Sequence, residues 1–130
     1  MTLEIEIYPP VNGNQYVMLS GRLDSMTHEQ LDEQLEPLLS GRPNALVLDL
    51  ATLDYISSAG VRCILKARKA LAPHEGRVLI LHPQEQIRRV IEIVQAVPLD
   101  SIFASSDEVD SYLDALQRRI LGESETPSTD

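Results

Sequence analysis

Two adjacent serines, Ser57 and Ser58, end a largely apolar run and stand directly before Ala59-Gly60. A pair of hydroxyls at such a junction has three chemical uses: it can cap a helix, act as a nucleophile or accept a modification. Serine is a preferred residue at a helix start, so capping alone could explain why the pair is there.

The residues around Ser58 do not form the pattern of a catalytic serine. A nucleophile elbow follows G-x-S-x-G, and Ile56 stands where the first glycine is required. The histidines are His28, His74 and His82, and none has the surroundings of a triad base. P-loop, dinucleotide-binding and metalloprotease motifs do not occur. We therefore predict that the chain is not an enzyme.

Modification fits the position of the serines better than catalysis does. A phosphate on a serine adds about −1.5 to −2 charges. The free N–H groups and the dipole at a helix N-terminus would accommodate that charge inside the protein. Ala59 and Gly60 add little bulk, so another protein's active site could approach the hydroxyl closely. This pattern indicates a switch that a partner reads.

The strands that position the serines are predicted from apolar periodicity. Residues 3–20 alternate on both sides of a Pro, Asn and Gly-containing turn, which predicts a hairpin. Residues 45–50, ALVLDL, read as a central strand covered on both faces. Residues 77–82, RVLILH, read as another buried strand, and residues 99–104 form a short apolar piece. The serine pair therefore lies between a strand and the next helix.

Four segments have helical periodicity instead. They cover residues 23–39, residues from Ser58 to 71, residues 83–96 and a last segment from Ser105 onward. Thr27 with Gln30, and Ser105 with Glu108, match the capping-box spacing. Pro37 predicts a bend or an early end of the first helix.

This order of elements predicts one α/β domain. An opening hairpin followed by strand–helix units indicates a small mixed β-sheet with about four helices packed against it. We place the domain at residues 1–121 and predict a disordered acidic tail over residues 122–130. Functional groups in open α/β sheets gather at the carboxyl ends of strands, which is where the serines fall.

Composition narrows the range of partners. The formal net charge of −9 argues against nucleic acid, which requires a clustered basic surface. No apolar run is long enough to cross a bilayer, so we predict no membrane partner. Cys63 is the only cysteine, which excludes an internal disulfide and a cysteine-rich zinc site and fits a cytoplasmic location. Asp49 and Asp54 read as loop or cap residues, so we predict no metal and no cofactor.

Three stretches of the sequence resemble one family. LVLDLATLDYISSAGVRCILKARKAL, SGRLDSMTHEQLDEQL and QIRRVIEIVQAVPLDSIF are similar to segments of the STAS domain family, specifically of bacterial anti-sigma factor antagonists. The similarity extends over roughly residues 3–120 and implies a STAS-like fold. The residue before the family's phosphorylated serine is often Asp, and here it is Ser57; the residue after it is often Ser, and here it is Ala59.

The resemblance implies a function by partner switching. The unphosphorylated antagonist binds an anti-sigma factor that is also a serine protein kinase, phosphorylation of the motif serine breaks the complex, and a metal-dependent serine phosphatase restores it. The position of the motif implies Ser58 as the acceptor and Ser57 as the second choice. The partner-binding residues that it implies are Gly21, Leu23, Asp24, Ser57, Ala59, Gly60 and Arg62.

Other functions stay open at this point. The chain could be a STAS module of a stress-signalling scaffold or of a lipid-transport complex, without a phosphorylation switch. A stand-alone hydrolase would require turnover that depends on Ser58. The sequence leaves open whether the chain forms a homodimer.

Overall fold

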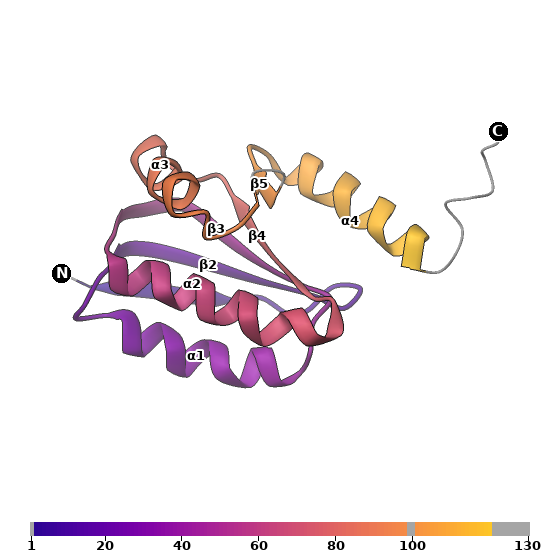
Figure 1. Ribbon diagram of the computed structural model, residues 1–130, viewed down its shortest axis with the longest axis horizontal. Coiled ribbons are helices and arrows are strands. Elements are labelled where there is room, and N and C mark those ends of the chain that lie inside the picture. The colour runs from indigo at the N-terminus through magenta and orange to yellow at the C-terminus, as the bar shows by residue number, and fades with distance from the viewer. Residues whose placement is uncertain (1, 99–100, 121–130) are drawn as a thin grey trace.

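The computed structural model describes residues 2–98 and 101–120, with the side chains of 106 and 116–120 left out of the description (Figure 1). The predicted domain end at 121 and the predicted tail over 122–130 lie outside these residues. Within them, no helix is both long enough and apolar enough to pass through a bilayer.

The strands form one mixed sheet, as predicted. They are β1 (Leu3–Ile7), β2 (Asn14–Leu23), β3 (Ala45–Ile56), β4 (Arg77–Leu81) and β5 (Ile102–Phe103), in the spatial order β1-β2-β3-β4-β5. The β1–β2 hairpin is antiparallel, and every other neighbouring pair is parallel. β3 is longer than the predicted strand and continues to the residue before Ser57.

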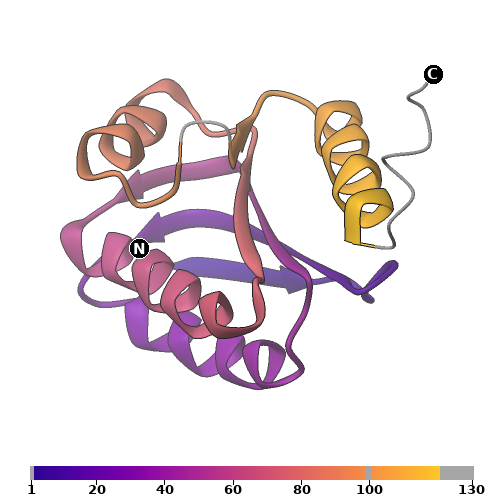
Figure 2. The same ribbon diagram turned by 45° about the vertical axis from the view of Figure 1, so that its right-hand side comes forward.

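The helices cover the two faces of the sheet unequally. α1 (His28–Ser40), α2 (Ser58–Leu71) and α3 (Glu85–Val94) pack on one face, and a short 3₁₀ turn (Ala72–His74) follows α2. α4 (Ser106–Ile120) packs on the opposite face, apart from the other helices in Figure 2. The two apolar clusters are separated by the sheet, and the main one contains residues of all three helices on its side.

Two of the helix starts agree with the capping predictions. The hydroxyl of Ser57 accepts a hydrogen bond from the N–H of Gly60 at 3.5 Å, which makes Ser57 the N-cap of α2. The hydroxyl of Ser105 accepts from the N–H of Glu108 at 3.2 Å, and the Glu108 carboxylate accepts from the N–H of Ala104 at 3.2 Å. These bonds use N–H groups that have no partner inside a helix.

The predicted capping box at the start of α1 is wrong. The Thr27 hydroxyl donates to the carbonyl of Arg22 at 2.9 Å and accepts from the N–H of Asp24 at 2.9 Å, so it holds the preceding loop. The Gln30 amide donates to the carbonyl of Leu3 at 2.9 Å. Both side chains are used by long-range or loop contacts, which local spacing does not reveal.

An early end of α1 at Pro37, one of the two predicted effects of this residue, is not observed. The helix passes through this residue and continues to Ser40, where the N–H of Gly41 bonds to the carbonyl of Leu38 at 3.2 Å. A proline removes one backbone donor, and Pro37 lies on the exposed side within the last turns of the helix. The loss is therefore small enough for the helix to continue.

The start of α2 is pressed against the end of β2. Leu23 pairs with Ile56 across the two parallel strands, and its carbonyl accepts the N–H of Ser57 at 2.9 Å. A Cβ at Gly60 would lie 2.7 Å from Leu23 Cγ and 2.8 Å from Ile56 Cγ1. Position 60 therefore has no space for a side chain, and the glycine permits this close approach.

Gly60→Ala is expected to destabilise the protein by about 1 to 3 kcal/mol, because the new methyl overpacks the contact with Leu23. Gly41→Ala is the matched control, since a Cβ there meets its nearest atom at 3.4 Å. The control should retain its stability or gain up to about 1 kcal/mol. Equal stability of the two variants in denaturant unfolding would contradict the close packing at position 60.

Ser57→Ala and Ser58→Ala should differ in the same measurement. Loss of the cap at Ser57 is expected to cost about 0.5 to 1 kcal/mol, in the lower part of the usual range because its hydrogen bond is long. Ser58 has an exposed side chain, so its alanine variant should stay within about 0.5 kcal/mol of the parent. A larger loss in Ser58→Ala than in Ser57→Ala would show that the capping roles are reversed.

Candidate functional site

Ser58 is the first residue of α2 and its side chain is exposed. Its hydroxyl takes part in no hydrogen bond with the rest of the described chain, whereas the hydroxyl of Ser57 caps the helix. A modifying enzyme can therefore reach Ser58 without breaking a contact within the fold. Attack on Ser57 would remove the cap from the N–H of Gly60.

The backbone around Ser58 is suited to negative charge. The N–H groups of Ser58 and Ala59 have no acceptor among residues 2–98 and 101–120, and the first turn of α2 contains no acidic residue. The N-terminal end of a helix carries a partial positive charge. Together these groups can stabilise a phosphate on the Ser58 side chain.

The loop after β2 lies beside this helix start and is ordered by Asp24. One oxygen of its carboxylate accepts from the N–H of Met26 at 2.9 Å and from the Thr27 hydroxyl at 3.3 Å. The other oxygen pairs with Arg22 Nε at 3.5 Å. The hydrogen bond from Met26 is the largest cause that lowers the pKa of Asp24 below its usual range, and the contacts with Thr27 and Arg22 act in the same direction.

The structure adds side chains that the sequence analysis did not name. The Arg22 guanidinium lies over the Tyr55 ring, 4.1 Å from its centroid, and both residues are at strand ends next to Ser57. Met26, in the Asp24 loop, is 87% exposed. Exposed methionine and aromatic side chains are adaptable apolar contacts in protein interfaces. The one feature of the sequence that could have identified Arg22, Tyr55 and Met26 is that they lie after or near the ends of predicted strands.

The predicted partner-binding residues have two different environments. Leu23, Ala59 and Gly60 are buried, so they shape the site but do not present side chains to a partner. Gly21 has a φ of 99° at a strand irregularity, where a Cβ would collide with the Thr2 carbonyl oxygen of the N-terminal segment. The close approach of the two chain segments in the β1–β2 hairpin therefore explains why position 21 is a glycine.

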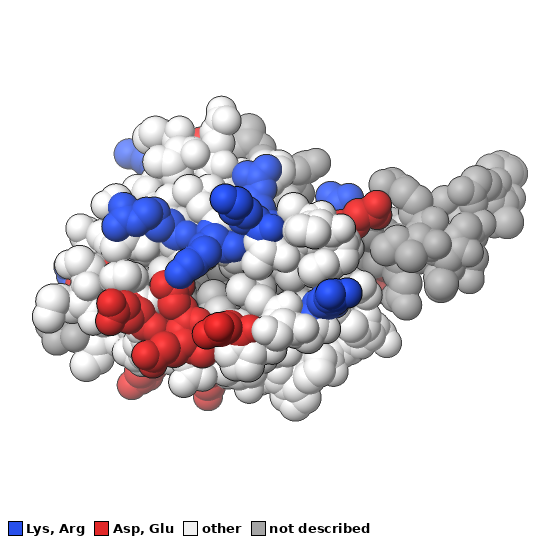
Figure 3. All heavy atoms as spheres, turned by 60° about the horizontal axis from the view of Figure 1, so that its bottom comes forward, with Lys and Arg blue, Asp and Glu red and all other residues white. Residues whose placement is uncertain are grey.

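The accessible members of the predicted set are Asp24, Ser57 and Arg62, together with the acceptor Ser58. Arg62 belongs to a row of basic side chains along α2, which faces acidic side chains along α1 in Figure 3. Arg62 therefore adds a basic side chain on the second turn of the helix that Ser58 begins, although the chain as a whole has a formal net charge of −9.

The histidines do not form a catalytic arrangement with Ser58. In the described part of the chain, no hydrogen bond joins a histidine to this serine; His82 lies 3.7 Å from Asp49 instead. Burial, followed by a hydrogen bond to Asp32, raises the pKa of the Cys63 thiol to about 12, which disfavours its thiolate form at neutral pH.

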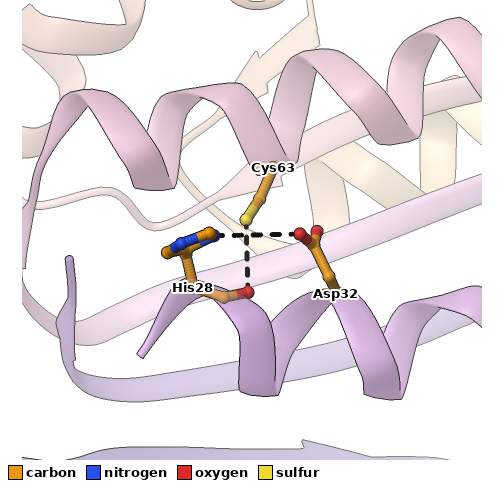
Figure 4. A group of neighbouring side chains, drawn as sticks. All are labelled: His28, Asp32 and Cys63. Carbon is orange, nitrogen blue, oxygen red and sulfur yellow. Dashed lines mark hydrogen bonds and ion pairs between the residues drawn. The ribbon is translucent and has the colours of Figure 1, made fainter. Parts of the chain in front are cut away.

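From the sequence we predicted no metal site. The structure brings His28, Asp32 and Cys63 together between α1 and α2, although 35 positions separate the histidine from the cysteine (Figure 4). The spacing along the chain gave no signal for this cluster.

The Asp24 loop should respond to acid. Because the pKa of Asp24 is lower in the folded than in the unfolded chain, its stabilising contacts are complete above about pH 4 and are lost as the pH falls through the folded-state value. The backbone amide signal of Met26, followed by NMR, should shift with a midpoint below about pH 4. Asp24→Asn should abolish this step, whereas Asp54→Asn should keep it. A midpoint at or above the ordinary value would contradict the hydrogen-bonded loop.

Solved structures of anti-sigma factor antagonists share the fold, and so does a sulfate transporter family protein from Wolinella succinogenes. SpoIIAA, an anti-sigma factor antagonist, aligns in its unphosphorylated form with a TM-score of 0.74 and 19% identity, over 86% of this chain and 97% of that one. The phosphorylated form of SpoIIAA from Bacillus aligns with a TM-score of 0.69 and 20% identity, over 85% of this chain and 99% of that one. At this identity the likeness shows the fold alone.

Comparisons of sequence are more specific. BtrV of Bordetella bronchiseptica, provisionally named an anti-sigma factor antagonist, is 35% identical over 83 residues, which are 64% of this chain and 72% of BtrV. The anti-sigma-B factor antagonist of Staphylococcus epidermidis is 30% identical over 77 residues, which are 59% of this chain and 71% of that protein. The sequence model of the STAS domain matches residues 3–109. The chain therefore belongs to the STAS domain family, and these relatives within it are named as anti-sigma factor antagonists.

Proposed function

We propose that this protein is an anti-sigma factor antagonist that works by partner switching, with Ser58 as the phosphorylated residue. The exposed Ser58 hydroxyl at the start of α2, next to a serine already used as the cap, is the observation that carries this proposal. The unphosphorylated protein binds an anti-sigma factor with serine kinase activity, phosphorylation releases it, and a metal-dependent serine phosphatase reverses the change. The names of the relatives support the role of an anti-sigma factor antagonist.

The structure supports Ser58 over Ser57 as the acceptor. Phosphorylation of Ser57 would break the hydrogen bond from Gly60 and add charge at a half-buried position. At Ser58 the phosphate lies on the surface, next to N–H groups without acceptors in the described chain. The fold is therefore expected to stay the same while the charge of the binding face changes by about −1.5 to −2.

The binding face that we propose consists of Ser58, Asp24, Met26, Tyr55 and Arg62. It combines an exposed apolar side chain, an aromatic ring under a guanidinium and a basic side chain on the second turn of α2. A partner that fits the neutral serine would have to desolvate a dianion after phosphorylation, which is costly without a matching cation. This cost is the physical basis of release.

The proposal assigns no catalytic activity to the chain. Ser58 has no hydrogen-bonded base within the described residues, and the Cys63 thiol is buried and protonated at neutral pH. A cytoplasmic location stays a prediction from composition.

The test is phosphorylation with a serine kinase of the anti-sigma factor class from the same genome. With ATP, the intact mass should rise by one phosphate, and peptide analysis should place it on Ser58. Ser58→Ala should abolish the modification and keep kinase binding. No phosphate on either Ser57 or Ser58 would exclude the switch and favour a scaffold or transport role.

Binding measurements test the consequence of the added charge. Ser58→Asp should weaken binding to the anti-sigma factor with serine kinase activity by at least about tenfold, the effect of roughly 1.4 kcal/mol. Ser40→Asp is the matched control, since it adds the same charge at an exposed serine at the far end of α1. Equal affinities of the two variants in a titration would contradict release by charge at the start of α2.

A further inference from the structure

Three different donor groups converge between α1 and α2, one turn below the start of α2 (Figure 4). His28 and Asp32 are four residues apart on one face of α1, with Nδ1 of the histidine 3.8 Å from the carboxylate. Cys63 faces them from α2, and its Sγ lies 3.5 Å from the carbonyl oxygen of His28. The three donor atoms lie within 4.8 Å of one another.

This donor set matches the preferences of zinc. Imidazole nitrogen, thiolate sulfur and carboxylate oxygen bind Zn²⁺ at about 2.0 to 2.3 Å, which places tetrahedral ligands about 3.3 to 3.8 Å apart. The cluster is within roughly 1 Å of that arrangement. Cys63 is buried and fixed, while the side chains of His28 and Asp32 are 30% and 27% exposed and can adjust.

The cluster opens on one side to a hollow of about 380 Å³ on the surface. All three donor residues line this hollow, as do Ala59 and Arg62 from the first two turns of α2. A fourth ligand, water or a side chain of a partner, can therefore reach a bound ion. Three protein ligands with one open position are a common arrangement for zinc.

Lys66 would compete with a bound metal ion for the carboxylate of Asp32. Its ammonium lies 3.1 Å from Oδ2 of Asp32, and its side chain is 67% exposed. An exposed ion pair contributes little, about 0 to 1 kcal/mol, so Lys66 can move away at low cost. The Cys63 proton must also leave: as the zinc–sulfur bond forms, the thiol releases one proton to the solvent.

We propose that His28, Asp32 and Cys63 bind one zinc-class divalent ion between α1 and α2. The ion joins the first turn of α1 to the second turn of α2 and so fixes the helix that presents Ser58. This site does not depend on the proposed phosphorylation, and each can be tested in the absence of the other. Mg²⁺ is not expected to bind, because it prefers an all-oxygen set.

The test uses the full chain, kept reduced and freed of metal with a chelator. Titration with Zn²⁺ should show one ion per chain, and Co²⁺ should produce a thiolate-to-cobalt charge-transfer band in the near ultraviolet. Cys63→Ser should abolish this band. Cys63→Ser, His28→Gln and Asp32→Asn should each weaken the Zn²⁺ affinity by on the order of 10- to 100-fold or more.

His82→Gln is the matched control, because His82 also lies beside a carboxylate, 3.7 Å from Asp49, but has no thiol in its surroundings. It should bind Zn²⁺ as the parent does. At the same Zn²⁺ concentration, the Tm of the parent and of His82→Gln should rise by a few degrees and that of Cys63→Ser should rise less. His28→Gln and Asp32→Asn change accessible side chains, so they decide the question if Cys63→Ser fails to fold.

Absence of one-to-one binding would overturn the proposal, as would an affinity that is the same in the parent and all three ligand variants. Equal loss in His82→Gln would place the ion elsewhere and also overturn it. Excess Mg²⁺ that displaces Zn²⁺ would contradict the assigned donor set. Phosphorylation of Ser58 is measured in the metal-free protein, independently of Zn²⁺ binding. Failure of one proposal therefore does not imply failure of the other.

Discussion

The contact between the end of β2 and the start of α2 is the constraint on which the rest of the site depends. Parallel pairing brings Leu23 level with Ile56, and the carbonyl of Leu23 binds the N–H of Ser57. Gly60 lets the two segments meet without a side chain between them. The direction in which α2 begins, and therefore the exposure of Ser58, follows from this packing.

That constraint separates two serines that look equivalent in the sequence. Ser57 is tied to the fold by both its backbone N–H and its hydroxyl, whereas Ser58 begins the helix with its side chain in solvent. A buried or capping group is costly to modify, because its hydrogen bond must be replaced. An exposed group beside free N–H donors changes the surface and leaves the interior as it was.

Much of this fold could be predicted because its signals are local. The N-terminal strand alternates, the first half of β3 is a continuous apolar run and the segment from Ser58 has helical periodicity, and the structure confirms all three elements. The predicted Thr27 cap is wrong because its hydroxyl donates to the carbonyl of Arg22, five positions back in β2. The cluster of His28 with Cys63 depends on how two helices rotate against each other, which periodicity does not determine.

The sheet divides the interior into two apolar clusters, and the buried residues around Ser58 belong to only one of them. The cluster beneath α4 contains Val109, Leu113 and the Phe103–Tyr112 ring pair, and it touches none of the residues around Ser58. The match to the family ends at residue 109, near the start of this helix. Because α4 packs on the other side of the sheet, substitutions that loosen its cluster are expected to lower stability without moving the backbone that presents Ser58.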